Sequence, residues 1–195
     1  MPVDFDAAAH AIAAFLRALG YDPDTHPNLR ETPERVARAY ADELLRGAAV
    51  DVAELVRAGS EPRPESEPGG LVAVRGIEMA TVCPHHLTPA LGRATVAYIP
   101  GARLLGVGTV ARLVDACARR LTMQESIGQQ VVDALMQHAG AHGAYCRLVL
   151  VHGCLSARGT CQTRASVATV ASAGELAGPA ASPHLQLLLD EPPDG

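Results

Sequence analysis

The alternation of hydrophobic patterns along residues 71–172 is the feature that most constrains the fold of this chain. Residues 71–82 and 93–100 have patterns typical of strands, and so do residues 144–154 and 160–172. Between these two pairs lie two helical patterns, with apolar residues at Val110, Leu113, Val114, Cys117 and Leu121, then at Ile127, Val131, Leu135 and Met136, before Gly140. The order strand, strand, helix, helix, strand, strand predicts an α+β fold, an antiparallel sheet with helices on one face.

The region before this unit is predicted to be helical. Residues 6–19 have an apolar side and end at Gly20, and a second helix is expected to begin at Thr32 as N-cap, followed by Pro33. A Pro/Gly/Ser/Glu-rich stretch then marks a boundary. We therefore expect a helical region over 1–57, a linker over 58–70, a main domain over 71–173, which becomes the catalytic domain if the resemblance described below holds, and a tail over 174–195.

Composition narrows the class of protein. The hydrophobic fraction is 48% and no apolar run approaches the length of a membrane span, so a soluble globular protein is expected. The net charge of −5 gives no reason to expect nucleic-acid binding. The N-terminus is acidic where a secretory signal would be basic, and the five cysteines are an odd number. These features favour a cytoplasmic protein with reduced thiols, some of them bound to a metal.

Two segments bring together residues that bind metals. Cys83, His85 and His86 lie in CPHH, and His152 and Cys154 lie in VHGC, where alternate residues of an extended strand share a face. Four of these residues would make a closed structural zinc site, whereas three would leave one position open for water, as in catalytic sites. Cysteine is also a common buried apolar residue, which is the simpler interpretation for Cys117, Cys146 and Cys161.

Residues 122–125 (TMQE) allow two interpretations. Thr122 and Glu125 have the spacing of a capping box at a helix N-terminus. The alternative is a functional carboxylate at Glu125, which would accept two hydrogen bonds from the edge of a guanine ring. All sixteen basic residues are arginine, so a phosphate site in this chain could use only arginine, histidine or backbone N–H groups. Arg112 and Arg158 are the candidates for such contacts.

From TPERVARAYADEL through CPHHLTP, AYIP, ARLVDACARRLTMQES and VHGCLSARG, residues 32–172 resemble GTP cyclohydrolase I. The resemblance implies the tunnelling fold, a ββααββ unit whose subunits close into rings, and a homodecamer with active sites at subunit contacts. It implies a role for each candidate residue. Zinc would be bound by Cys83, His86 and Cys154; His85 and His152 would transfer protons; Gln124 and Glu125 would hold guanine; Arg112 and Arg158 would contact phosphate.

The activity implied is hydrolysis of the imidazole ring of GTP, which releases formate and forms 7,8-dihydroneopterin triphosphate for folate and pterin synthesis. The chain departs from the family pattern at Pro84, where the family has Glu, and at Ser126, where it has Arg. Gly108 and Thr109 replace a Ser-Lys pair that includes a phosphate-binding lysine. Two alternatives follow: a paralogue acting on a purine nucleotide with fewer phosphates, or a non-catalytic member that keeps zinc for assembly or regulation.

Overall fold

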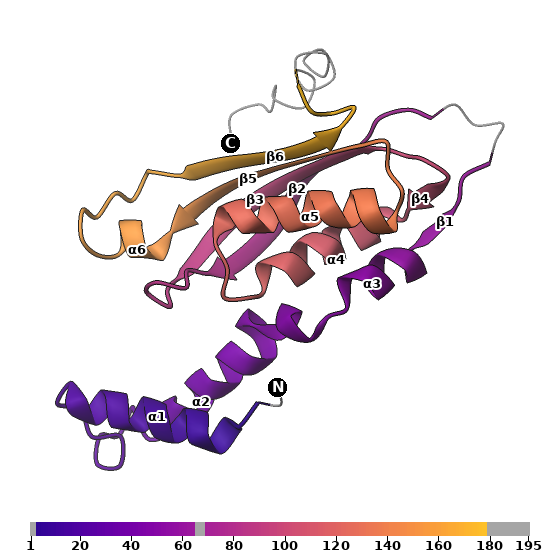
Figure 1. The fold of residues 1–195 in the computed structure, drawn as a ribbon. Coiled ribbons are helices and arrows are strands. Elements are labelled where there is room, and N and C mark those ends of the chain that lie inside the picture. Colours follow the sequence, from indigo (N-terminus) through magenta and orange to yellow (C-terminus); the bar gives the residue numbers. More distant parts are fainter. Residues whose placement is uncertain (1–2, 65–68, 179–195) are drawn as a thin grey trace. The chain divides into compact units, whose positions relative to one another are not determined.

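The computed structural model describes residues 3–64 and 69–178, and the chain divides into two compact units, Met1–Arg46 and Gly47–Gly195 (Figure 1). The C-terminal tail expected over 174–195 therefore lies largely outside the described residues. Among the described residues, no helix combines the length and the hydrophobicity needed to cross a bilayer.

The first unit is helical, as predicted. Helix α1 (Phe5–Ala18) begins at Asp4, whose side chain accepts a hydrogen bond from the backbone N–H of Ala7, and the chain turns at Gly20 with φ +87°. Helix α2 (Thr32–Arg38) continues into the π-helical segment η1 (Ala39–Leu44). The N-cap of α2 is Glu31 and not Thr32, because the Glu31 carbonyl already accepts the N–H of Arg35.

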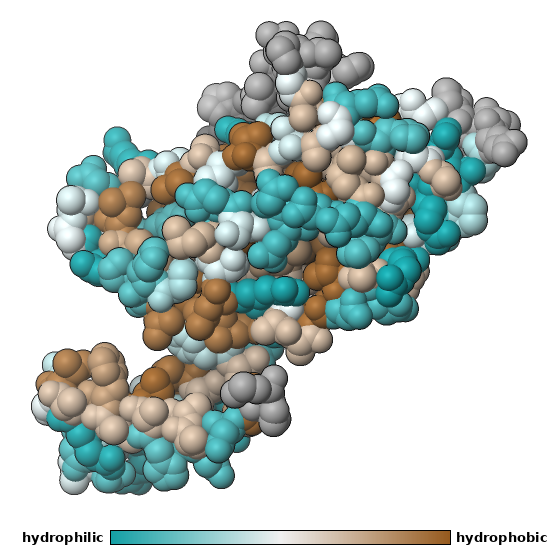
Figure 2. Space-filling view, viewed as in Figure 1, coloured by the Kyte–Doolittle hydropathy of each residue, from teal (hydrophilic) through white to brown (hydrophobic). Residues whose placement is uncertain are grey.

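Helix α1 buries none of its residues within the described chain. Figure 2 shows hydrophobic residues gathered on one side of this unit and hydrophilic residues on the other. Phe15 and Leu19, which belong to the predicted apolar side of the helix, are 60% and 57% exposed. The amphipathic pattern is thus confirmed, but its apolar side is not covered by the rest of this unit.

The second unit begins with short elements. The 3-10 helix η2 (Arg46–Ala49) spans the division between the units and is followed by α3 (Val52–Ala58), which is capped by Asp51. Strand β1 (Ser60–Pro62) pairs antiparallel with β4 (Arg103–Leu105). β1 lies within the stretch expected to be a linker. The division into a helical region, a linker, a catalytic domain and a tail stays a prediction.

A four-stranded antiparallel sheet forms the body of this unit and confirms the predicted α+β fold. Its strands are β2 (Val72–Val82), β3 (Pro89–Ile99), β5 (Gly143–His152) and β6 (Val167–Gly174), in that spatial order. Helices α4 (Val107–Ala118) and α5 (Gln124–His138) cover one face of the sheet (Figure 1). Between helices and sheet lies a core that includes Val96, Leu113, Ile127, Leu135 and Leu148, all at most 1% exposed.

Two strand predictions are wrong at their ends. The strand predicted over 144–154 stops at His152, and Cys154 lies in the short helix α6 (Gly153–Ser156), so His152 and Cys154 do not share a strand face. The strand predicted from residue 160 begins only at Val167. Cys161 has φ +50° and Gly159 has φ +62°, and backbone in this left-handed region turns the chain instead of extending it.

Candidate metal centre

The loop between β2 and β3 holds the first two residues of a cysteine–histidine cluster. Cys83 follows the last residue of β2, and its backbone N–H donates to the carbonyl of Thr88 at 2.9 Å. The N–H of Leu87 donates in turn to the carbonyl of Cys83 at 2.9 Å, and Leu87 has φ +52°. These bonds close a tight loop that fixes Cys83 and presents His86.

The third residue arrives from the far end of β5. Antiparallel pairing of β3 with β5 sets Ala90 opposite His152, so α6 follows directly beside the start of β3. Gly153 permits this approach, because a Cβ there would lie 2.8 Å from the carbonyl oxygen of Pro89. As a result, the ligand atoms of Cys83, His86 and Cys154 all lie within 4.8 Å of one another.

The cluster fits a zinc ion by its donors and by its spacing. Zinc sites with two cysteines, one histidine and one open position are known catalytic centres. A tetrahedral zinc ion separates its sulfur and nitrogen ligands by about 3.6 Å, from Zn–S and Zn–N bonds of about 2.3 and 2.05 Å. Sγ of Cys83 lies 3.8 Å from Nδ1 of His86. Three of the five candidate ligands therefore converge, as in a site with an open position.

The electrostatics of Cys154 agree with a site that needs a cation. Burial raises the pKa of this thiol above its ordinary value of 9.0, and the sulfur of Cys83 raises it further. Two sulfurs at this separation repel each other when both are ionised, and a metal ion between them removes that repulsion.

His152 is held by Gln124, the first residue of α5. The Gln124 side chain is buried, and its Nε2 donates to the backbone carbonyls of Val167 at 2.9 Å and Leu148 at 3.3 Å. Since both partners are carbonyls, the amide orientation is assigned, and Oε1 is the atom that lies 2.8 Å from Nε2 of His152. This contact is not apparent from the sequence, because it joins residues 28 positions apart.

Glu125 and Thr122 do not form the capping box. The N-cap of α5 is Met123, which makes no side-chain cap hydrogen bond, so Thr122 lies one residue too early. An isolated bridge between Val82 and Leu121 fixes the connection into α5 at this point. Glu125 is exposed in the first turn of α5, next to Gln124. This geometry leaves the second interpretation, a carboxylate available to a ligand.

The remaining predicted residues make no hydrogen bond to these groups in the described chain. His85 is exposed, and its ring centre lies 6.3 Å from that of His86. Arg158 is exposed in the turn after α6. Arg112 is exposed on α4 and donates through Nη2 to Oγ1 of Thr109 at 3.0 Å. Thr109 itself is 2% exposed, so its side chain does not point to solvent.

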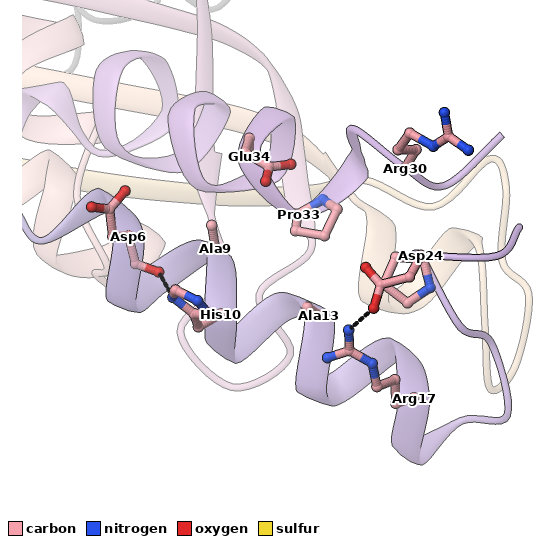
Figure 3. Close-up of a pocket in the computed structure, with 10 residues that line it drawn as sticks. Asp6, Ala9, His10, Ala13, Arg17, Asp24, Arg30, Pro33 and Glu34 are labelled. Atoms are coloured by element: carbon pink, nitrogen blue, oxygen red, sulfur yellow. Dashed lines mark hydrogen bonds and ion pairs between the residues drawn. The ribbon is translucent and has the colours of Figure 1, made fainter. Parts of the chain in front are cut away.

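A separate cavity of about 260 Å³ lies in the first unit, between α1 and the chain leading into α2 (Figure 3). Its wall contains the ion pair between Arg17 and Asp24, with the atoms 2.6 Å apart, and His10, whose Nδ1 lies 2.7 Å from the carbonyl oxygen of Asp6. These two contacts are the ones drawn between the lining residues in Figure 3. None of the residues predicted for the functional site lines this cavity.

The fold and the cluster together define an α+β protein with a Cys–His–Cys group that can bind a transition metal at one end of its sheet. The sequence model of GTP cyclohydrolase I matches residues 8–185. The chain belongs to the GTP cyclohydrolase I family, which confirms the resemblance seen in the motifs.

Individual relatives are similar over most of the chain. GTP cyclohydrolase 1 of Leifsonia xyli is 42% identical over 92% of this chain and 92% of its own. GTP cyclohydrolase 1 of Bifidobacterium longum is 37% identical over 96% of this chain and 92% of its own. That of Deinococcus radiodurans is 39% identical over 82% of this chain and 72% of its own. A solved structure, the archaeosine synthase QueF-Like in the apo form, aligns with a TM-score of 0.46 and 18% identity over 55% of this chain and 97% of that chain, a likeness too low to support an assignment.

Proposed function

We propose that this protein opens the imidazole ring of GTP by hydrolysis, releases formate and forms 7,8-dihydroneopterin triphosphate. The observation that carries the proposal is the convergence of Cys83, His86 and Cys154 in a chain of this family. The buried Gln124 bonded to the half-buried His152, together with the exposed Glu125, adds groups that a purely structural metal site does not need.

The residues that would hold zinc are Cys83, His86 and Cys154. A zinc ion in such a site would supply a Lewis acid that lowers the pKa of a bound water molecule to about 7. The loop hydrogen bonds at Cys83 and the close approach of Gly153 to Pro89 fix the backbone on either side of the cluster. A preorganised backbone of this kind reduces the ordering that binding requires.

His152 is the residue proposed to move protons. Because Oε1 of Gln124 accepts a hydrogen bond from Nε2–H of His152, the other ring nitrogen, Nδ1, carries the lone pair in the neutral ring. Nδ1 is therefore the atom that would take up and return a proton during ring opening. His85, exposed in the loop next to His86, is the second proposed proton-transfer residue.

Glu125 is proposed to recognise the guanine base. A carboxylate accepts two hydrogen bonds, and guanine offers a ring N–H and an amino group side by side. Its neighbour Gln124 was also predicted to contact guanine, but its amide N–H groups are used by β5 and β6. We therefore assign Gln124 to holding His152 and leave base recognition to Glu125.

The phosphate contacts are the least complete part of the site, which favours a second candidate function. Arg112 and Arg158 are the proposed contacts, and both are exposed. Thr109, at the position of the family's lysine, is buried and bonded to Arg112. This observation supports a paralogue that acts on a guanine nucleotide with fewer phosphates.

The protein is also proposed to work as a homo-oligomer. Strands β2 and β6 are the edges of the sheet in the described chain, and an open edge offers backbone groups to a neighbouring chain. The uncovered apolar side of α1 agrees with the same expectation. The resemblance to the family suggests ten chains, with sites at the contacts between them.

The proposal is tested by incubating the purified protein separately with GTP and with GDP, and by measuring formate together with pterin fluorescence after oxidation. Ring opening of GTP is the expected result. Equal or faster turnover of GDP would favour the paralogue. Absence of formate from both nucleotides, in protein shown to contain zinc, would contradict the proposal and favour a non-catalytic member of the family.

A further inference from the structure

The hydroxyl of Thr88 is buried and has no hydrogen-bond partner of regular geometry. Only two side-chain hydroxyls in the described chain share this condition, those of Thr88 and Thr81. A buried hydroxyl that bonds to nothing destabilises the folded chain, so such a group calls for a partner that the unliganded chain does not supply.

Thr88 lies against the turn that carries Cys154. A Cβ added to Gly153 would lie 3.4 Å from Cβ of Thr88 and 3.8 Å from its Oγ1, and Gly153 directly precedes Cys154. The backbone of Thr88 is fixed on both sides, since its carbonyl accepts the N–H of Cys83 at 2.9 Å and the next residue is Pro89. Only the side chain retains freedom to rotate.

Thr88 lies between two of the residues that would bind zinc. Its carbonyl is bonded to Cys83, and its side chain packs against Gly153, the residue before Cys154. A neutral thiol is a weak hydrogen-bond acceptor, whereas a thiolate is a strong one. Ionisation of the Cys154 sulfur on metal binding would therefore supply the acceptor that this hydroxyl lacks.

From this geometry we propose that Thr88 is a positioning residue of the metal site, whose Oγ1–H donates to the Cys154 sulfur once that sulfur binds a metal ion as thiolate. This inference rests on the proposed zinc site. Residues that hydrogen-bond to a metal ligand without binding the metal themselves orient that ligand, and their loss typically lowers metal affinity by about 10- to 100-fold. The side chain would be recruited when the site loads, because the thiolate is the stronger acceptor.

Zinc affinity of full-length variants tests the proposal without measuring catalysis. Thr88→Val keeps the shape of the side chain and removes the donor, so we expect zinc affinity, measured by competition with a chelator, to fall by about tenfold or more. Thr88→Ser keeps the donor and is expected to remain within about threefold of the wild-type chain, well short of the loss typical of such groups. With Co²⁺ in place of zinc, the sulfur-to-cobalt absorption of Thr88→Val should move to longer wavelength, because a sulfur that accepts no hydrogen bond gives up an electron more easily.

Thr81→Val is the matched control. The Thr81 hydroxyl is likewise buried and without a partner, but Thr81 lies on β2 opposite Ala90 and is not among the residues nearest to a Cβ at Gly153. The inference is overturned if Thr88→Val binds zinc as the wild-type chain does, if Thr81→Val weakens binding equally, or if Thr88→Ser behaves like Thr88→Val. Should Thr88→Val fail to fold, Thr88→Ala removes the same donor and takes its place. A wild-type chain that binds no zinc would instead contradict the proposed function.

Discussion

At the scale of single residues, Gln124 and Glu125 are neighbours with opposite surroundings. Gln124 is 4% exposed and bonded to two strands and to His152, whereas Glu125 is exposed at the start of α5. The first residue stabilises the site from inside, and the second is available to a ligand. Substitutions at the two positions should therefore have different consequences.

Glu125→Gln is expected to fold normally and to lose turnover efficiency with GTP. The amide places a donor opposite a guanine donor, and each lost bond to a charged group removes about 1.5–3 kcal/mol. This corresponds to a fall of about ten- to hundredfold in kcat/KM. Glu54→Gln is the control, since Glu54 is the acidic residue in the first turn of α3, outside the site. Unchanged kinetics of Glu125→Gln would remove this residue from base recognition.

The sequence predicts the candidate metal ligands better than the residues that contact and position the site. The spacing of CPHH and VHGC indicates five candidate ligands. Only the family pattern selects Cys83, His86 and Cys154 among them. The contacts of Gln124 and Thr88 depend on packing between segments distant in sequence, which a local pattern does not encode. The capping box failed for a similar reason, because the bridge at Leu121 sets where α5 begins.

At the scale of elements, the first turn of α4 determines which side chain could contact a phosphate group. The carbonyl of Gly106 accepts the N–H groups of Thr109 at 2.8 Å and Val110 at 3.3 Å. Thr109 packs against Gly59, whose Cβ would lie 2.2 Å from its Oγ1, while a Cβ on Gly108 would meet nothing within 4 Å. Gly108, and not Thr109, therefore faces open space.

We expect Thr109→Lys to destabilise the protein and Gly108→Lys to be tolerated. A lysine at 109 would bury its ammonium group, which costs more than about 2 kcal/mol when unpaired. At Gly108 a lysine side chain would extend into open space, so it carries no burial cost. Thermal unfolding measures both effects, and Gly108→Lys should then improve turnover of GTP more than of GDP. A Thr109→Lys variant as stable as the wild-type chain would contradict the burial of this side chain.

Two buried thiols of the core, one on α4 and one on β5, predict a loss of stability at alkaline pH. Burial raises the pKa of Cys117 on α4 to about 11 and that of Cys146 on β5 to about 12, from an ordinary value of 9.0. The unfolded chain therefore releases these protons first as pH rises. The stabilisation is fully present below pH 9 and is lost toward pH 11–12, by up to about 1.4 kcal/mol per pH unit for each thiol.

Urea unfolding at several pH values measures this slope. The double variant Cys117→Ala, Cys146→Ala should be less stable at neutral pH, because of the cavities, but should lose less stability between pH 9 and 11. Equal slopes for the variant and the wild-type chain would show that these thiols do not control alkaline unfolding.

Strand and helix positions in the second unit were predictable because each element keeps one apolar face over its whole length. The ends of β5 and β6 were not, since residues 153–166 form a helical turn and a loop that follow tertiary contacts and positive φ angles. The short pair of β1 and β4 was also missed, because three-residue strands carry no period to detect.

At the scale of the whole molecule, each unit leaves a surface open among its described residues: the second has two free strand edges, and the first does not cover the apolar side of α1. We expect light scattering of the active protein to give a mass of at least twice the chain mass of 20.3 kDa. Dilution that separates the chains should also reduce turnover, because the proposed sites lie between subunits. A fully active monomer would contradict this part of the account.

The central claim is that ring opening of GTP depends on zinc held by Cys83, His86 and Cys154, and titration of metal-free protein tests it most directly. Formate release from GTP is measured as zinc is added, with Cys161→Ser and Cys154→Ser as paired variants, since Cys161 is exposed and outside the cluster. The account predicts no release without metal, a linear rise that ends at one zinc per chain for the wild type and Cys161→Ser, and little release from Cys154→Ser. Full turnover by metal-free protein, or by Cys154→Ser, would contradict it.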